Sequence, residues 1–153
     1  MGIASALFII GPAFARPIYH LISMIVGTEW LIEATLCNAE KLRDENALRE
    51  VFARLICQLG LKSIGSVWHK FGGEGGVTGL VALTESHLAC HTYPECRTAT
   101  FNLYCCRTRP EWAWEANLRE LLGAEAVSII KIERGKAIAD ADESKSAAVG
   151  GDL

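Results

Sequence analysis

The stretch Leu83-Thr84-Glu85-Ser86-His87-Leu88-Ala89-Cys90-His91-Thr92-Tyr93-Pro94-Glu95 is the centre around which the chain is organised. A glycine-rich loop, Gly72 to Gly76, and an apolar run precede it. We expect a strand at Val77–Thr84 that continues extended through Ser86–His91, until Tyr93-Pro94 marks a turn or an edge. A core strand does not need a carboxylate, a hydroxyl, two imidazoles and a thiol so close together, so the stretch also predicts a functional site.

Regular elements are expected on both sides of this stretch. A strand at 29–36 comes first, followed by a connection over 37–43. Asp44 suits the N-cap of a helix that ends near Gly60. Apolar residues recur at helical spacing along one face of this helix: Leu48, Phe52, Leu55, Ile56 and Leu59. Further strands are expected at 61–71, 98–105 and 126–133.

A second helix is expected before the last strand. Thr108 and Glu111 have the spacing of a capping box, Pro110 is tolerated in a first turn, and Gly123 ends the helix. Neighbouring strands in sequence favour antiparallel pairing. The predicted fold class is therefore α+β, a two-layer sandwich of a mostly antiparallel sheet with two helices on one face. The other face is too apolar to meet water, so we expect a second subunit to cover it.

The length of 153 residues predicts one domain with tails. We place the domain at 28–135. Residues 1–27 are an apolar extension of doubtful status, and a misassigned start with Met24 as the true start is favoured over an export signal. A Gly-Pro pair interrupts this run, so no membrane span is expected. Residues 136–153 are small and acidic and are expected to be a disordered tail.

Charge and cysteine content narrow the functional class. The formal net charge is −3 and no basic stripe is present, which excludes a typical nucleic-acid binder. The chain is too long and too aliphatic for a disulfide-dense mini-domain, so its six cysteines are interpreted as reduced thiols of a cytoplasmic protein.

A metal-binding module is one interpretation of the central stretch. It would use His87, Cys90, His91 and Cys96, but their spacing matches no standard zinc pair. In a strand, Cys90 would also point away from both histidines. We therefore expect no metal site.

The central residues resemble a known enzyme family. Glu85-Ser86-His87-Leu88, His91-Thr92, Pro94-Glu95 and the later Cys106 are similar to the short prokaryotic S-adenosylmethionine decarboxylases. The likeness runs from about Thr28 to Gly135. It implies a self-processing, pyruvoyl-dependent decarboxylase that makes decarboxylated S-adenosylmethionine, the aminopropyl donor for spermidine. It also implies a homodimer of processed units with composite sites.

The resemblance implies that the chain makes its own cofactor by cleavage between Glu85 and Ser86. Ser86 Oγ attacks the Glu85 carbonyl, and the peptide becomes an ester. Proton loss at Ser86 Cα then expels the Glu85 carboxylate, and the remaining dehydroalanine hydrolyses to a pyruvoyl group. By the motif match, His91 is the processing base. The pyruvoyl ketone forms a Schiff base with the substrate amine and accepts the electrons left when CO₂ departs.

The resemblance also implies roles in substrate turnover. Cys106 matches the general acid that protonates the product, and an ordinary thiol, with a pKa of about 8.5, holds a proton at neutral pH. Glu95 matches the residue that binds the ribose hydroxyls, and Phe71 matches an aromatic that stacks on adenine. Thr78 stands where the family usually has serine, so a hydroxyl is retained there.

Several departures from the family lie where the nucleoside or sulfonium of the substrate should bind. The departures as a whole include Tyr93 for the usual tryptophan, Cys96-Arg97 for an aromatic and a glycine, and Arg107 for the glycine after Cys106. An arginine or ornithine decarboxylase on the same scaffold is therefore the main alternative. A non-catalytic partner subunit is a remote one.

Strand geometry limits how these residues can share a site. On one straight strand, Thr78 and Ser86 would lie about 26 Å apart, and Ser86 and His91 would lie about 16 Å apart on opposite faces. Either the chain bends sharply or two subunits contribute.

Overall fold

The computed structural model describes residues 25–135, so the expectations for most of 1–27 and for 136–153 lie outside the described residues. The strands are β1 (Gly27–Thr35), β2 (Ser63–Lys70), β3 (Val77–Leu83), β4 (Ser86–Tyr93), β5 (Thr98–Cys105) and β6 (Ala126–Arg134). The helices are α1 (Ala39–Arg43), α2 (Glu45–Gln58) and α3 (Trp114–Leu122), with a 3₁₀ turn, η1, at Pro94–Cys96.

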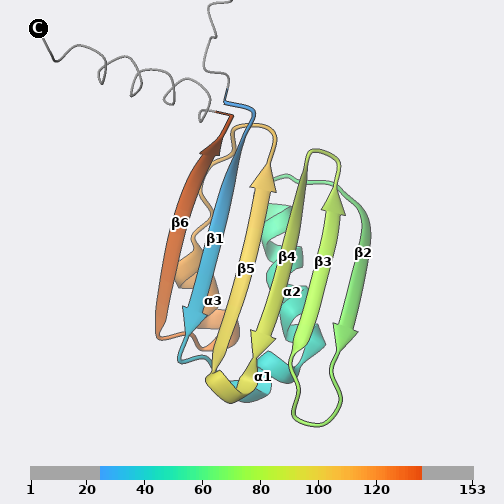
Figure 1. Ribbon diagram of the computed structural model, residues 1–153, viewed down its shortest axis with the longest axis vertical. Helices are drawn as coiled ribbons and strands as arrows, with labels where there is room; N and C mark the ends of the chain where they lie inside the picture. Colours follow the sequence, from blue (N-terminus) through green and yellow to red (C-terminus); the bar gives the residue numbers. More distant parts are fainter. Residues whose placement is uncertain (1–24, 136–153) are drawn as a thin grey trace, which may run out of the picture.

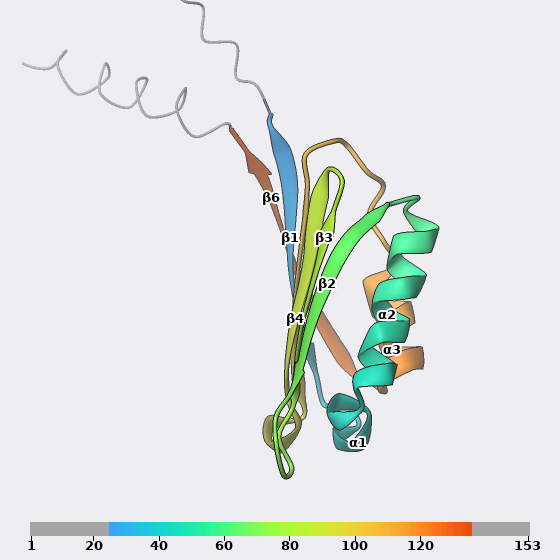
Figure 2. The same ribbon diagram turned by 90° about the vertical axis from the view of Figure 1, so that its right-hand side faces the viewer.

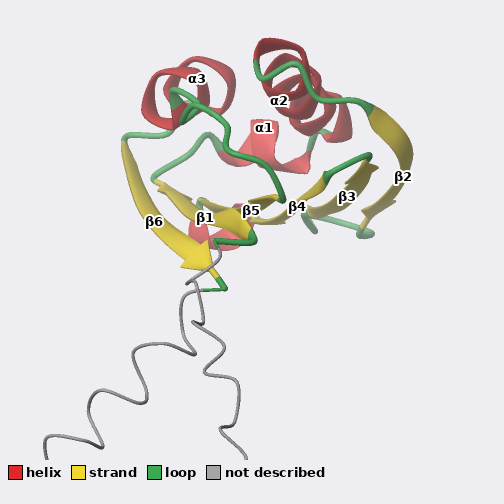
Figure 3. Ribbon diagram, turned by 90° about the horizontal axis from the view of Figure 1, so that it is seen from above, coloured by secondary structure: helices red, strands yellow, loops and turns green. Residues whose placement is uncertain are grey.

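The strands form one sheet in the order β2-β3-β4-β5-β1-β6, and every neighbouring pair is antiparallel. Figure 1 shows the sheet face-on, and Figures 2 and 3 show that the helices lie against one side of it. The predicted two-layer α+β sandwich is confirmed. It has one more strand and one more helix than the sequence indicated.

The core fills the space between the sheet and the helices. In β1, Trp30, Ile32 and Ala34 are buried while the residues between them face outward, which is the alternation of a half-buried strand. Aromatic rings join the two layers. The Phe52 ring of α2 lies 4.9 Å from the Trp68 ring of β2, and the Phe101 ring of β5 lies 6.1 Å from the Trp114 ring of α3.

The predicted start of α2 is confirmed, but the segment before it is not a simple connection. Asp44 caps α2 by accepting a hydrogen bond from the Asn46 backbone N–H. The expectation of a connection over 37–43 was wrong, because this segment contains α1. The Asn38 side chain caps α1 by accepting from the backbone N–H groups of Glu40 and Lys41.

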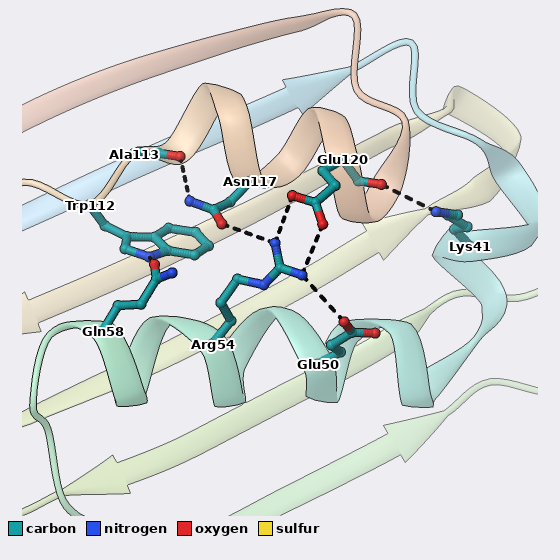
Figure 4. A network of polar contacts seen from close by, with 8 residues as sticks. All are labelled: Lys41, Glu50, Arg54, Gln58, Trp112, Ala113, Asn117 and Glu120. Carbon is teal, nitrogen blue, oxygen red and sulfur yellow. Dashed lines mark hydrogen bonds and ion pairs between the residues drawn. The ribbon is translucent and has the colours of Figure 1, made fainter.

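The predicted capping box at Thr108 and Glu111 was wrong. Helix α3 begins only at Trp114, and no side chain caps it. The reason is tertiary packing: Trp112 is buried, and its indole N–H donates to the Gln58 side chain at the end of α2 (Figure 4). This anchor holds the segment before α3 against α2. The predicted end is confirmed, since Gly123 adopts a left-handed conformation with φ of 68°.

The expectation that the chain continues extended from Val77 to His91 was also wrong. It reverses at Thr84-Glu85, and β3 and β4 form a hairpin in which Leu83 pairs with Ser86. The favoured two-residue hairpin turns require positive φ and therefore favour glycine or asparagine. Within residues 25–135, only Leu36 and Arg97 have positive φ among non-glycine residues, so this turn lacks the usual sequence signal.

The sheet face opposite the helices carries exposed apolar side chains. Leu31, Leu80 and Ile130 are 37%, 46% and 57% exposed, and Val67 on the edge strand β2 is 69% exposed. We call this surface the outer face. None of the helices within residues 25–135 is long and apolar enough to cross a membrane.

We predict that Gly79→Ala destabilises the fold, because a Cβ at Gly79 would overlap the Trp68 ring packed across the β2–β3 pair. The expected loss in the free energy of unfolding is about 1–3 kcal/mol, measured by chemical denaturation. Gly65→Ala is the matched control in the same strand pair, since nothing lies within 4 Å of a Cβ there. Equal stability of the two variants would contradict this packing.

Candidate active site

The Glu85–Ser86 peptide lies at the tip of the β3–β4 hairpin, beside the end of β5. Ser86 pairs with Leu83 on one side and with Cys105 on the other. The Glu85 carbonyl accepts a hydrogen bond of 2.9 Å from the Cys106 backbone N–H. Ser86 Oγ is buried and forms no full hydrogen bond within residues 25–135, although it lies close enough to the Cys105 thiol to lower the pKa of that thiol. A buried, unpaired hydroxyl therefore lies next to a polarised carbonyl.

The two adjacent thiols at the end of β5 differ in environment. Cys105 is buried and Cys106 is exposed. Burial raises the pKa of Cys105, while the Ser86 hydroxyl and the Arg109 charge partly offset the rise. Burial, together with the neighbouring Cys106, also raises the pKa of Tyr104. Cys106 is thus the accessible thiol of the pair.

A small hollow of about 290 Å³ opens on the outer face near this end of the sheet. The Tyr104 and His87 rings stack in it with centroids 5.5 Å apart. Glu29 accepts hydrogen bonds from Asn102 and Arg134 here, and these contacts hold the pKa of Glu29 below its usual value. The described lining residues are Val26, Glu29, His87, Tyr104, Arg134 and Gly135.

The other end of the hairpin holds a second group of predicted site residues. Thr78 and His91 are direct cross-strand partners, and Thr78 Oγ1 lies 3.0 Å from His91 Nδ1 in a hydrogen bond. His91 lines a cavity of about 380 Å³ on the outer face, together with residues of β5, β1 and β6. Glu33, Thr100 and Asn102 supply polar groups to the same cavity.

Phe71 and Glu95 lie at this second end. Phe71 follows β2, and its ring, which is 50% exposed, contacts the His69 ring with centroids 4.6 Å apart. Glu95 lies in η1, directly after β4, and is exposed. In Figure 1 the β2–β3 loop and η1 are at the lower end of the sheet, and the β3–β4 turn is at the upper end.

The structure therefore divides the predicted site residues into two groups at opposite ends of one sheet. The processing end holds Glu85, Ser86 and Cys106. The binding end holds Thr78, His91, Phe71 and Glu95. The hairpin brings Thr78 to His91, but Ser86 and His91 stay about 16 Å apart along β4. Burial alternates along β4, and this places Ser86 Oγ on the helix side and His91 on the outer face.

Two features near these groups were missed in the sequence. Glu33 interrupts the apolar pattern of β1 with an outward charge, and this signal could have placed it on the outer face beside His91. Arg107 and Arg109 both pair with the Glu85 carboxylate. No local pattern reveals these pairs, because they depend on β5 ending beside the hairpin tip.

Comparison with known proteins identifies the family. Residues 28–135 match the family described as S-adenosylmethionine decarboxylase. The chain belongs to the S-adenosylmethionine decarboxylase family. An S-adenosylmethionine decarboxylase proenzyme of Prochlorococcus marinus is 36% identical over 112 residues, which cover 72% of this chain and 88% of the relative. The corresponding proenzyme of Moorella thermoacetica is 34% identical with the same coverage.

A solved structure supports the same family membership. The crystal structure of the adenosylmethionine decarboxylase from Aquifex aeolicus superposes with a TM-score of 0.63 at 26% sequence identity. The match covers 72% of this chain and 92% of that chain. The family that the central motif predicted is confirmed, whereas the roles of individual residues stay predictions.

The residues of the metal-binding interpretation are not arranged around a common point in the structure. Within residues 25–135, no group of three His, Cys, Asp or Glu residues is arranged to hold a metal ion. Cys90 is buried, and burial raises its pKa to about 12, while His91 faces the outer cavity. The structure therefore does not gather His87, Cys90, His91 and Cys96 into one site.

Proposed function

We propose that this chain is the proenzyme of a pyruvoyl-dependent S-adenosylmethionine decarboxylase that cleaves itself between Glu85 and Ser86. The observation that supports this most directly is the arrangement at the hairpin tip. Ser86 Oγ forms no full hydrogen bond among the described residues and has only the weakly polar Cys105 thiol beside it, so this oxygen is free to act as a nucleophile. The Glu85 carbonyl beside it already accepts the Cys106 backbone N–H.

This hydrogen bond favours the first step of processing. When Ser86 Oγ adds to the Glu85 carbonyl carbon, negative charge develops on the carbonyl oxygen. A backbone N–H at 2.9 Å stabilises this charge as an oxyanion hole does. The Cys106 backbone serves this step whatever its side chain does, so processing and turnover use different parts of one residue.

We infer that the processing base comes from a second copy of the chain. His91 of the same chain is too far from Ser86 and faces the other way. A two-fold axis that packs the outer faces of two sheets against each other can bring His91 of one copy over the backbone of Ser86 in the other. From that face His91 would act on the Ser86 Cα proton, because Ser86 Oγ points to the helix side. The same packing would cover the exposed Leu31, Leu80 and Ile130.

Substrate binding and turnover then combine both ends. A pyruvoyl group derived from Ser86 would supply the electron sink for loss of CO₂. Cys106 is exposed at the same end and can donate its thiol proton to the product carbon. From the partner copy, Thr78 would orient His91, Glu95 would bind the ribose hydroxyls, and Phe71 would stack on adenine. Decarboxylated S-adenosylmethionine is the expected product, and six free thiols fit a cytoplasmic enzyme.

Intact mass spectrometry of the purified chain tests self-processing. We predict two polypeptides, one that ends at Glu85 and one that begins at position 86. The second carries a pyruvoyl group in place of an N-terminal amine. Ser86→Ala removes the nucleophile and should leave one chain, whereas Ser66→Ala, a control at an exposed strand position, should split normally. A single stable wild-type chain would refute the proposal.

Release of CO₂ from S-adenosylmethionine, arginine and ornithine, measured in parallel, tests the substrate. We expect turnover of S-adenosylmethionine alone; turnover of arginine or ornithine instead would establish the alternative decarboxylase.

Cys106→Ala keeps the backbone N–H, so this variant should still split but lose about 100-fold or more in the rate of product formation. Cys57→Ala, an exposed thiol on α2, is the control. Normal turnover by Cys106→Ala would exclude this thiol as the proton donor.

A further inference from the structure

Two arginines that follow Cys106 hold the side chain of Glu85, the last residue before the proposed cleavage point. Arg107 Nη2 lies 2.7 Å from Glu85 Oε1, and Arg109 Nη2 lies 3.6 Å from Glu85 Oε2. The side chains of Glu85 and Arg109 are 33% and 28% exposed, so this part of the contact is partly shielded from water. Arg107 is 72% exposed and approaches from the surface.

In the uncleaved chain, the positive charges at this contact outnumber the negative ones. One carboxylate, that of the Glu85 side chain, faces two guanidinium groups. After cleavage, Glu85 is a chain end and carries an α-carboxylate as well as its side-chain carboxylate. Two negative charges then face two positive charges. The arginine pair therefore complements the cleaved state better than the precursor.

We infer that Arg107 and Arg109 bind the carboxylate that leaves in the elimination step, and so accelerate the second step of processing. This inference rests on the proposed self-cleavage. Arg107 and Arg109 would then be positioning residues, because they would hold the carboxylate of Glu85 that leaves in this step.

The two steps of processing differ in the charge they create. In the first step, the Glu85–Ser86 C–N bond breaks as Ser86 Oγ bonds to the Glu85 carbonyl carbon, and the hydroxyl proton passes to the Ser86 nitrogen. In the second step, a base takes the Ser86 Cα proton, the Oγ–Cβ bond breaks, and its electron pair leaves with Glu85 as an α-carboxylate. Water then hydrolyses the dehydroalanine and releases ammonia. Only the second step produces a lasting negative charge on the Glu85 α-carboxylate. The two guanidinium groups therefore stabilise the transition state of the second step more than that of the first.

Arg109 is the better placed of the two to receive the new carboxylate. Its contact with Glu85 is the longer one, and it lies close enough to Cys105, the strand partner of Ser86, for its charge to act on that thiol. A guanidinium presents five donors in a planar fork, so it can hold one carboxylate and still bind another. Arg107 meanwhile retains the side-chain carboxylate at 2.7 Å.

The experiment separates the two steps with hydroxylamine, which cleaves an ester but not the precursor amide. In the double variant Arg107→Gln/Arg109→Gln, which keeps polar side chains without charge, elimination should slow by about tenfold or more. The ester should accumulate as a species of precursor mass that hydroxylamine splits at Glu85–Ser86. The double variant Arg107→Lys/Arg109→Lys should restore part of the rate.

Arg54→Ala is the matched control. Arg54 also bridges two glutamates, Glu50 and Glu120, but it does so between α2 and α3 and makes no ion pair with Glu85 (Figure 4). Its removal should leave both steps at the wild-type rate. Circular dichroism melting of every variant identifies losses that come from unfolding.

Two results would overturn the inference while leaving self-cleavage intact. One is a glutamine variant that splits at the wild-type rate. The other is a folded variant that stays resistant to hydroxylamine, because it would show that the arginines act on ester formation rather than on elimination. A wild-type chain that never splits would instead refute the proposed function itself, and this inference with it.

Discussion

The register of β4 between its two neighbours determines where Ser86 and His91, the central pair of predicted site residues, lie. Antiparallel pairing sets Ser86 opposite Leu83 and Cys105, and it sets His91 opposite Thr78 and Thr100. Because side chains alternate between faces, a slip of one residue would move Ser86 Oγ to the outer face and His91 into the core. Leu88 and Cys90, buried on the helix side, oppose such a slip. One strand thus carries a buried serine hydroxyl at one end and an outward imidazole at the other.

Under the proposed function, this arrangement leaves each copy of the chain with two incomplete half-sites. The Glu85 carbonyl, Ser86 Oγ and the Cys106 thiol gather where β4 begins and β5 ends. The Thr78–His91 hydrogen bond lies where β3 begins, near Phe71 and η1. The outer face connects the two ends, and its exposed apolar side chains favour association with a second sheet. Stability and catalysis would then depend on the same packing of two copies.

Much of the fold could be predicted from local patterns in the sequence. The apolar alternation of β1, the Asp44 cap of α2 and the Gly123 end of α3 are each set by near neighbours. The central motif also indicated the family, because its residues resemble those of known members, and the comparison confirms this.

The features that the sequence did not predict arise from contacts between distant segments or from weak local signals. The reversal at Thr84-Glu85 uses neither glycine nor positive φ, so pairing of β3 with β4 enforces it rather than turn chemistry. Burial of Trp112 against α2 delays the start of α3, although Thr108 and Glu111 have capping-box spacing. The ion pairs of Glu85 with Arg107 and Arg109 likewise exist only because β5 ends beside the hairpin tip.

The central claim is that the site forms between two copies, and co-production of two inactive chains tests it directly. One chain carries His91→Ala and keeps Ser86; the other carries Ser86→Ala and keeps His91. We predict that neither splits alone, and that together they yield a C-terminal polypeptide that begins at position 86 and carries the His91→Ala substitution. Splitting of the His91→Ala chain alone, or no splitting in a mixture that forms dimers, would contradict the account.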